Sequence, residues 1–249
     1  MMKPEIPLTG SPLPPSAHSL SLFFPCWNEE ATVEPLTRKA AEVLDRIGGD
    51  YEIIIVDDGS IDRTGAIADR LATENGRIRV VHHPVNRGYG AALQSGFRAA
   101  TKELVFYTDG DGQFDLDELP PLLPLISRFD IVSGYRINRQ EGIIRKFNAF
   151  CWGQLVRLLF DLPYRDIDCA FKLYRRSLFD RMELLSTGAL IDTEILARAR
   201  RKGAAITQVG VHHYPRIAGK ATGARLSVIL RAFRELLKLR KQIVRSDRP

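Results

Sequence analysis

The sequence predicts an α/β fold in which helices cover both faces of a mostly parallel sheet. Short apolar runs alternate with segments of helical periodicity, which is the pattern of consecutive βαβ units. The chain has 249 residues, 45% of them hydrophobic, so it can bury a sizeable core. Polar and acidic residues directly follow several apolar runs, as expected where strands end at a ligand site.

The first half of the chain alternates strands and helices most clearly. We expect strands over residues 20–24, 52–56, 78–81 and 103–108. We expect the helices between them over residues 33–47, 64–73 and 91–100. Glycines stand where the first two helices should end, at Gly48, Gly49 and Gly76, because glycine is the usual residue just past a helix C-terminus.

The second half is less regular. We expect strands over residues 130–133, 171–174 and 205–211, and a helix over residues 193–202 that ends at Gly203. An amphipathic stretch over residues 143–162 mixes basic side chains with aromatic and aliphatic ones.

The C-terminal segment, residues 225–245, has the periodicity of a basic amphipathic helix. Its apolar face would comprise Leu226, Ile229, Leu230, Phe233, Leu236 and Leu237. Such a helix can lie on anionic lipid, and it can equally pack on the domain or on a partner subunit. We therefore divide the chain into a flexible proline-rich segment (1–18), a folded domain (19–222) and a basic helix (223–249).

Composition narrows the class of protein. The three cysteines are widely spaced, which argues against a disulfide framework and a structural zinc site. No stretch has the roughly 20 apolar residues that span a bilayer, and no signal peptide precedes the domain. Residues 1–125 carry 11 basic and 19 acidic groups, whereas residues 126–249 carry 25 basic and 11 acidic groups. We expect a cytoplasmic protein whose basic half meets phosphate groups or an anionic membrane surface, with no nucleic-acid partner.

The clearest chemical signal is a pair of carboxylates after an apolar strand, Asp109 and Asp111. In an extended segment, residues i and i+2 point to the same face, so both carboxylates can address one cation. Oxygen ligands suit Mg²⁺ or Mn²⁺. Gly110 and Gly112 allow a sharp turn and a close approach of ligand, and Gln113 adds a neutral oxygen.

Polar segments also follow the first two strands, at residues 25–30 and 57–60. Because parallel strands end at one edge, these segments and residues 109–113 should converge on one rim of the sheet. Asp57 and Asp58 could cap the following helix, but two adjacent carboxylates exceed what a cap needs, so we expect them to contact ligand.

Two other motifs are excluded. Residues 58–62 and 109–113 imitate the start of an EF-hand, but neither loop has glycine sixth and glutamate twelfth. Residues 88–93 approximate a dinucleotide-binding fingerprint, but they follow the third strand instead of the first. Gly88 is better explained by a loop whose backbone approaches a ligand. The pairs His82–His83 and His212–His213 point to opposite sides of a strand, and we expect them to be structural.

Four motifs together resemble those of family 2 glycosyltransferases with the GT-A fold. They are residues 24–30 (FPCWNEE), 56–60 (VDDGS), 86–88 (NRG) and 109–113 (DGDGQ). The nearest branch makes polyprenyl-phosphate sugars and is typified by dolichol-phosphate mannosyltransferase. Any single motif is modest, but four in the family's order and spacing are specific. The resemblance covers residues 19–222.

The resemblance implies roles for individual residues. The nucleotide would be held by residues after the first two strands, Pro25, Trp27, Glu29, Asp57 and Asp58. Asp109, Asp111 and Gln113 would bind the cation and the donor diphosphate. Arg136 and Arg145 resemble phosphate-binding arginines, and Arg216 and Lys220 lie in a segment that resembles the mobile acceptor loop.

The chain also departs from the family. Trp27 stands where tyrosine is common. Residues 168–172 (DCAFK) replace an aspartate-x-glycine-phenylalanine-arginine pattern, in which Asp168 keeps the aspartate to which the resemblance gives an acceptor-binding role. Some relatives add spanning helices, and this chain stops at Pro249 without them. Membrane contact is therefore expected to be peripheral.

The expected activity is metal-dependent, inverting transfer of a hexose from a nucleotide sugar, of the GDP-mannose or UDP-glucose type, to polyprenyl phosphate at the cytoplasmic membrane face. One alternative is a hydroxyl acceptor, which would need a carboxylate base such as Asp168 or Asp192. Another is a nucleotide-sugar-binding protein without catalysis. A nucleotidyltransferase would carry a glycine-rich basic loop near its N-terminus, which residues 24–30 are not. Oligomeric state stays open, a homo-oligomer included.

Overall fold

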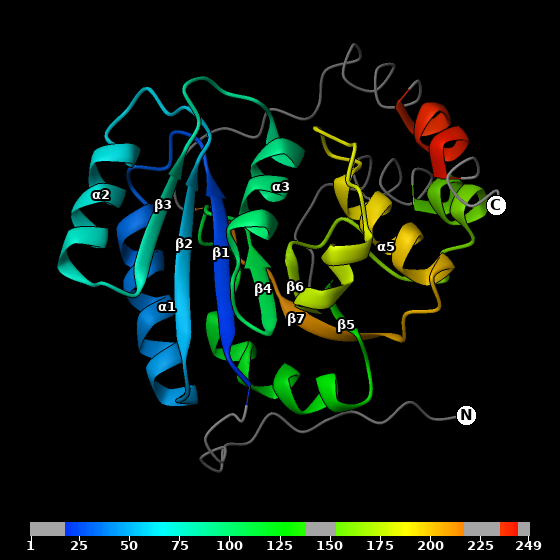
Figure 1. Ribbon diagram of the computed structural model, residues 1–249, viewed down its shortest axis with the longest axis horizontal. Helices are drawn as coiled ribbons and strands as arrows, with labels where there is room; N and C mark the ends of the chain where they lie inside the picture. Colours follow the sequence, from blue (N-terminus) through cyan, green and yellow to red (C-terminus); the bar gives the residue numbers. More distant parts are fainter. Residues whose placement is uncertain (1–17, 138–152, 217–234, 244–249) are drawn as a thin grey trace.

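The computed structural model describes residues 18–137, 153–216 and 235–243, and a seven-stranded sheet forms its centre (Figure 1). The strands are β1 (Leu20–Cys26), β2 (Tyr51–Asp57), β3 (Ile78–His82), β4 (Leu104–Thr108), β5 (Ile131–Ile137), β6 (Phe171–Arg175) and β7 (Ile206–His212). The α-helices are α1 (Val33–Ile47), α2 (Thr64–Glu74), α3 (Tyr89–Ala99) and α5 (Ile191–Arg201). Short 3-10 segments are η1 (Leu116–Glu118), η2 (Pro120–Ser127) and η3 (Arg176–Arg181).

The sheet is parallel except at one strand. Its order is β3-β2-β1-β4-β6-β5-β7, and β6 runs antiparallel to both of its neighbours, β4 and β5. Strands β1, β2 and β4 are buried almost throughout, as near-continuous apolar runs covered on both faces should be. The predicted fold class is confirmed, and the antiparallel insertion of β6 is the detail that the alternating pattern did not reveal.

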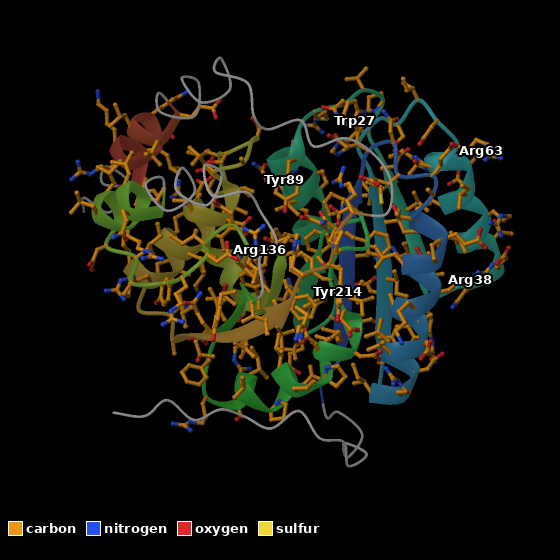
Figure 2. The ribbon with its side chains drawn as sticks, turned by 180° about the vertical axis from the view of Figure 1, so that it is seen from behind. Trp27, Arg38, Arg63, Tyr89, Arg136 and Tyr214 are labelled. Atoms are coloured by element: carbon orange, nitrogen blue, oxygen red, sulfur yellow. The ribbon has the colours of Figure 1, made fainter. Side chains whose placement is uncertain are left out.

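The strand order explains how the helices are distributed. The connections from β1 through β2 to β3 run in one direction across the sheet, and the connection from β3 to β4 reverses it. Because parallel crossovers are right-handed, α1 and α2 cover one face and α3 the other, as the two views show (Figures 1 and 2). The reversal leaves a switch point between β1 and β4, which is where α/β sheets bind ligands.

Helices α3 and α5 pack on the same face. Phe23 and Tyr107 are register partners on β1 and β4, and both rings contact Phe97 of α3. Tyr107 in turn pairs with Lys172 of β6, and both side chains hydrogen-bond to Asp192 of α5. The same layer of the core therefore supports the carboxyl ends of β1 and β4.

The C-terminal helical residues 235–243 pack beside the helical residues 153–160 (Figure 1). Leu236, Leu239 and Ile243 are buried in the common core, whereas Leu237 is 60% exposed. Of the two described residues of the predicted apolar face, Leu236 is therefore buried against the domain and Leu237 is exposed, and the buried stripe follows the 236, 239, 243 spacing. Residues 226–233 of the predicted face lie outside the described residues.

Most predicted elements lie within a few residues of the observed ones, and α1 has the predicted bounds. Of the amphipathic stretch 143–162, residues 143–152 are outside the described part of the chain. Across the described ranges, none of the helices has both the length and the hydrophobicity to cross a bilayer.

Candidate functional site

The loops that follow β1, β2 and β4 meet at the carboxyl edge of the sheet, as predicted. The amide of Asp58 donates to the carbonyl of Cys26 (2.8 Å), and the amide of Asn28 donates to Oγ of Ser60 (3.0 Å). The hydroxyl of Thr32 donates to the carbonyl of Gly110 (2.9 Å), which joins the first loop to the carboxylate loop. The three predicted segments thus form one rim.

Asp109 and Asp111 stand at the end of β4 within this rim. Gly110 between them packs so closely that a Cβ there would lie 2.5 Å from the carbonyl oxygen of Pro25. Gly112 has φ +70°, a conformation that favours glycine, and it turns the chain away after Asp111. Gly112 thus has the turn role that the sequence predicts, whereas Gly110 is required by packing against the backbone of Pro25.

The electrostatics of Asp109 indicate a demand for positive charge. Burial and the neighbouring carboxylate of Asp111 raise the pKa of Asp109 to about 7. The hydroxyl of Tyr89 donates to Oδ1 of Asp109 (2.9 Å) and favours the ionised form. Two carboxylates this close are stabilised by a shared cation.

In the structure, Arg216 supplies part of that charge. Its guanidinium donates to Oδ2 of Asp111 (2.8 Å) and lies 3.8 Å from Oε1 of Glu29. Partial burial raises the pKa of Glu29, an effect that Arg216 opposes. The structure thus brings together Glu29, Asp111 and Arg216, three residues predicted separately for nucleotide, metal and acceptor.

Gln113 points elsewhere. Its side-chain amide donates to the carbonyl of Tyr214 (2.7 Å), and its backbone carbonyl accepts from the amide of Tyr214 (2.8 Å). These bonds tie the carboxylate loop to the residues after β7. The role of Gln113 as a cation ligand stays a prediction.

The two aspartates fit a divalent cation that also binds a diphosphate. Within the described residues, no cluster of three or more His, Cys, Asp or Glu side chains forms a metal cage. Mg²⁺ in phosphate-binding sites is usually held by one or two carboxylates together with substrate phosphate oxygens. Burial and the charge of Asp111 raise the pKa of Asp109, and Arg216 pairs with Asp111, so added positive charge would stabilise the ionised carboxylates.

Asp57 and Asp58 are held by the protein itself. Asp58 accepts from the amides of Arg87 and Gly88 (2.9 Å each), and its Oδ1 lies 2.6 Å from Nδ1 of His83. Asp57 accepts from the amide of Ser60 (3.0 Å) and pairs with His82 (2.9 Å). Asp58 therefore fixes the loop before α3. The structural role expected for His82 and His83 is to hydrogen-bond to Asp57 and Asp58, respectively.

Gly88 and Gly90 are explained by packing. Gly88 has φ +96°, and a Cβ there would lie 2.8 Å from the carbonyl oxygen of Thr187. A Cβ on Gly90 would lie 2.6 Å from the carbonyl oxygen of Ser186. The imperfect dinucleotide fingerprint thus marks the contact between the start of α3 and residues 186–188.

Arg136 is already paired. Its guanidinium makes two hydrogen bonds with the carboxylate of Asp166 (2.8 and 2.6 Å), and its amide also donates to that carboxylate. A phosphate would have to share Arg136 with Asp166, a partner that the sequence did not suggest. The other predicted cations on this side, Arg145 and Lys220, lie outside the described residues.

The two candidate bases differ sharply. Asp192 is buried and bonded to the ammonium group of the fully buried Lys172 (2.7 Å), so it is committed to the core. Asp168 is exposed to solvent, but the protein atoms around it remove part of its hydration. This desolvation, together with the charge of Asp192, raises the pKa of Asp168 to about 6. Lys172 also donates to the carbonyl of Cys169, next to Asp168.

The remaining nucleotide candidates lie at the rim. Trp27 is 46% exposed and its indole is free to stack on a planar group. Figure 2 shows Trp27 at the strand-end edge, with Tyr89, Arg136 and Tyr214 nearer the middle of the molecule and Arg38 on its outer side. Pro25 forms the wall against which Gly110 packs.

Sequence reasoning missed Tyr89, His83 and Asp166 as members of this site. Tyr89 lies between the two glycines of the imperfect dinucleotide fingerprint, and no periodic signal marks it. The position of His83 one residue after β3, opposite two aspartates after β2, was the available hint.

Comparisons with known proteins identify the family of the chain. The model of the family described as glycosyl transferase family 2 matches residues 21–182. A dodecaprenyl-phosphate galacturonate synthase of Rhizobium johnstonii is 32% identical, and the match covers 72% of this chain and 54% of that protein. An undecaprenyl-phosphate 4-deoxy-4-formamido-L-arabinose transferase of Pseudomonas fluorescens is 29% identical over 85% of this chain and 62% of its own length. The chain thus spans little more than half the length of these relatives.

Solved structures share the fold. Glucosyl-3-phosphoglycerate synthase from Mycobacterium tuberculosis in complex with UDP superposes with a TM-score of 0.69 at 20% identity, covering 90% of this chain and 81% of that one. The same enzyme with Mn²⁺ and UDP-glucose gives a TM-score of 0.67 at 22% identity, covering 90% and 79%. The fold is GT-A.

Proposed function

The chain belongs to glycosyl transferase family 2, and from this premise we propose that it transfers a sugar from a nucleotide-sugar donor to a polyprenyl phosphate. The observation that carries the proposal is the carboxylate pair Asp109 and Asp111 at the switch point of the sheet, with Arg216 bonded to Asp111. The relatives named for polyprenyl-phosphate products support the choice of acceptor.

The donor would lie across the rim. Its base would meet the exposed ring of Trp27 and the loop after β2, where Asp57 and Ser60 stand. Its diphosphate would extend toward Asp109 and Asp111. We propose Mg²⁺ or Mn²⁺ as the cofactor, held by these two carboxylates with the diphosphate oxygens. A bound cation would act as a Lewis acid that offsets the charge of the departing diphosphate.

Arg216 can also stabilise the negative charge of the departing diphosphate. Its guanidinium already neutralises Asp111, and a fork of N–H donors suits phosphate oxygens as well as carboxylates. With a cation on Asp111, Arg216 would be free to bind the donor diphosphate. Preorganised positive charge placed where negative charge develops is a large contribution to catalysis.

The acceptor chemistry favours a phosphate. A phosphate monoester is largely ionised at neutral pH, since its second pKa is about 6, so it needs little base catalysis. Arg136, which is paired with Asp166, is a candidate for binding the acceptor phosphate. Arg145 and Lys220, which the sequence analysis also assigns to phosphate and acceptor, would add positive charge. We propose that the enzyme binds peripherally to the cytoplasmic face of the membrane, where it would have access to the phosphate group of a polyprenyl phosphate.

A second candidate is transfer to a hydroxyl acceptor. Asp168, open to solvent and with a pKa of about 6, is suited to act as a general base near neutral pH. Asp192, buried against Lys172, is not. A hydroxyl acceptor would therefore make Asp168 essential, whereas a phosphate acceptor would not.

The test is an acceptor panel with the full chain, Mn²⁺ and radiolabelled GDP-mannose, UDP-glucose and UDP-galacturonate. The acceptors are undecaprenyl phosphate, undecaprenol, which is the same lipid without phosphate, and a soluble saccharide. We expect a labelled lipid only with undecaprenyl phosphate, and turnover that survives Asp168→Asn. Transfer to undecaprenol or the saccharide, lost in Asp168→Asn, would favour the second candidate. Binding of a donor without turnover on any acceptor would overturn both.

A further inference from the structure

We propose that Tyr89 is a positioning residue that orients the Asp109 carboxylate for the divalent cation. The contact on which this rests is direct: the Tyr89 hydroxyl donates to Oδ1 of Asp109 at 2.9 Å. The inference depends on the proposed metal site, since it gives that site a support that the recognised motifs do not include.

The backbone of Tyr89 is fixed from the side of β2. Tyr89 is the first residue of α3, and it follows Gly88 in a left-handed conformation with φ +96°. The buried carboxylate of Asp58 accepts from the amides of Arg87 and Gly88, and His83 holds Asp58 in turn through a buried hydrogen bond. The start of α3 therefore cannot shift without breaking these bonds.

The opposite side of α3 is fixed as well. Gly90 packs against the backbone carbonyls of Ser186 and Gly188, close enough that a Cβ would lie 2.6 and 2.7 Å away. The side chain of Gln94 donates to the carbonyl of Ser186 (2.9 Å), and the buried carboxylate of Glu194 accepts from the amides of Leu185 and Ser186. Tyr89 thus projects from a clamped helix start.

Asp109 needs such a support more than Asp111 does. Asp111 accepts from the amide of Gln113 (3.1 Å) and from Arg216 (2.8 Å), so both of its oxygens have donors. The hydrogen bond from Tyr89 engages only one carboxylate oxygen of Asp109, Oδ1. Residues that hydrogen-bond to metal ligands fix their orientation, and losing one typically weakens metal binding by about 10- to 100-fold.

The test compares Mn²⁺ binding by wild type, Tyr89→Phe and Tyr51→Phe of the full chain, measured from the loss of the free Mn²⁺ EPR signal at pH 8.5 without nucleotide. Tyr51 is the matched control, because its hydroxyl donates to Asp45 (2.7 Å) in another tyrosine–aspartate pair away from the rim. We expect Tyr89→Phe to raise the Kd for Mn²⁺ by about tenfold and Tyr51→Phe to leave it unchanged. The KM for the donor should rise in Tyr89→Phe while the KM for the acceptor stays as in wild type.

A double-mutant cycle separates positioning from a general loss of structure. In an Asp109→Asn background, Tyr89→Phe should have no further effect on Mn²⁺ binding, since its effect passes through Asp109. Equal Kd values for Tyr89→Phe and wild type would overturn the role of Tyr89 and leave the proposed function standing. An undiminished effect in the Asp109→Asn background would also overturn it. Absence of Mn²⁺ binding by wild type, both without nucleotide and with UDP added, would overturn the metal site and this inference together.

Discussion

Arg216 and Asp111 are 105 residues apart in the chain, yet the guanidinium of one lies 2.8 Å from the carboxylate of the other. This salt bridge joins the residues after β7 to the carboxylate loop after β4, and the bonds between Gln113 and Tyr214 support it. It means that an arginine and a metal ion would compete for Asp111. In the free protein, either Arg216 or the metal ion would neutralise Asp111. Once a diphosphate is bound, both positive charges would contact the diphosphate.

Replacing Arg216 should separate these two roles. In Arg216→Gln the competitor for Asp111 is lost, so we expect Mn²⁺ to bind the free protein about three- to tenfold more tightly, in keeping with the strength of a charge-assisted hydrogen bond that is partly exposed. Turnover should fall, because a charge facing the diphosphate is lost. The control is Arg63→Gln, which removes an exposed pair with Glu30. Mn²⁺ affinity and turnover are measured on the same preparations, and weaker Mn²⁺ binding in Arg216→Gln would contradict the competition.

The raised pKa of Asp109 predicts a pH dependence of stability. Its folded pKa of about 7 exceeds the ordinary value of 3.8, so the folded state binds the extra proton between these values. The metal-free protein therefore loses stability as pH rises from about 4 to 7 and loses no more from this group above 7. Asp109→Asn removes the effect.

Thermal unfolding in EDTA at pH 5 and pH 8 measures this effect of Asp109 on stability. The Tm advantage of Asp109→Asn over wild type should grow between the two pH values, by about 2–4 °C for each kcal/mol involved. Added Mn²⁺ should raise the Tm of wild type and leave Asp109→Asn unchanged. An equal advantage at both pH values would contradict the assigned pKa.

Asp58 should matter for stability in a way that an exposed aspartate does not. Asp58→Ala leaves the amides of Arg87 and Gly88 and the ring of His83 without their buried partner, which should cost about 2–4 kcal/mol. The matched control is Asp69→Ala, which breaks the pairing of an exposed carboxylate with His82 and should cost less than about 1 kcal/mol. Urea unfolding gives both values. Similar costs for the two variants would show that Asp58 does not anchor the loop.

We expect stability to require glycine at position 90 only because α3 packs closely against the backbone of residues 186–188. Alanine usually stabilises a helix relative to glycine by roughly 1 kcal/mol, but in Gly90→Ala the new methyl would meet backbone atoms of residues 186–188 at 2.6–2.7 Å. We expect net destabilisation of about 2 kcal/mol or more. Gly76→Ala is the control, since a Cβ there meets nothing within 4 Å. A Gly90→Ala variant as stable as wild type would show that residues 186–188 move aside easily.

The elements and the rim were accessible from sequence because local patterns encode them. Alternating apolar runs give the strands, and the Asp109–Asp111 spacing puts two carboxylates at one strand end whatever the tertiary detail. The antiparallel strand β6 was not accessible. Its residues, Phe171–Arg175, are nearly all buried, like those of the parallel strands, and the direction of the strand depends on the long connection that precedes it.

Partners within the site were also beyond local reasoning. Nothing near Arg136 in the sequence names Asp166, and nothing near Asp111 names Arg216, because each pair forms only when distant loops meet. Asp168 and Asp192 look alike as sequence letters. Burial against Lys172 is what removes Asp192 from the candidate bases.

The carboxylate pair is tested most directly by the initial rate of sugar transfer to undecaprenyl phosphate in Asp111→Asn, with Asp117→Asn as the control. Asp117 pairs with Lys39 and Arg46 at the surface, away from the rim. We expect Asp111→Asn to lower kcat/KM by about 100-fold or more, the loss typical of removing a group that stabilises developing charge. Asp117→Asn should stay within about twofold of wild type. Wild-type turnover in Asp111→Asn would contradict the assignment of Asp109 and Asp111 to the cation and the diphosphate.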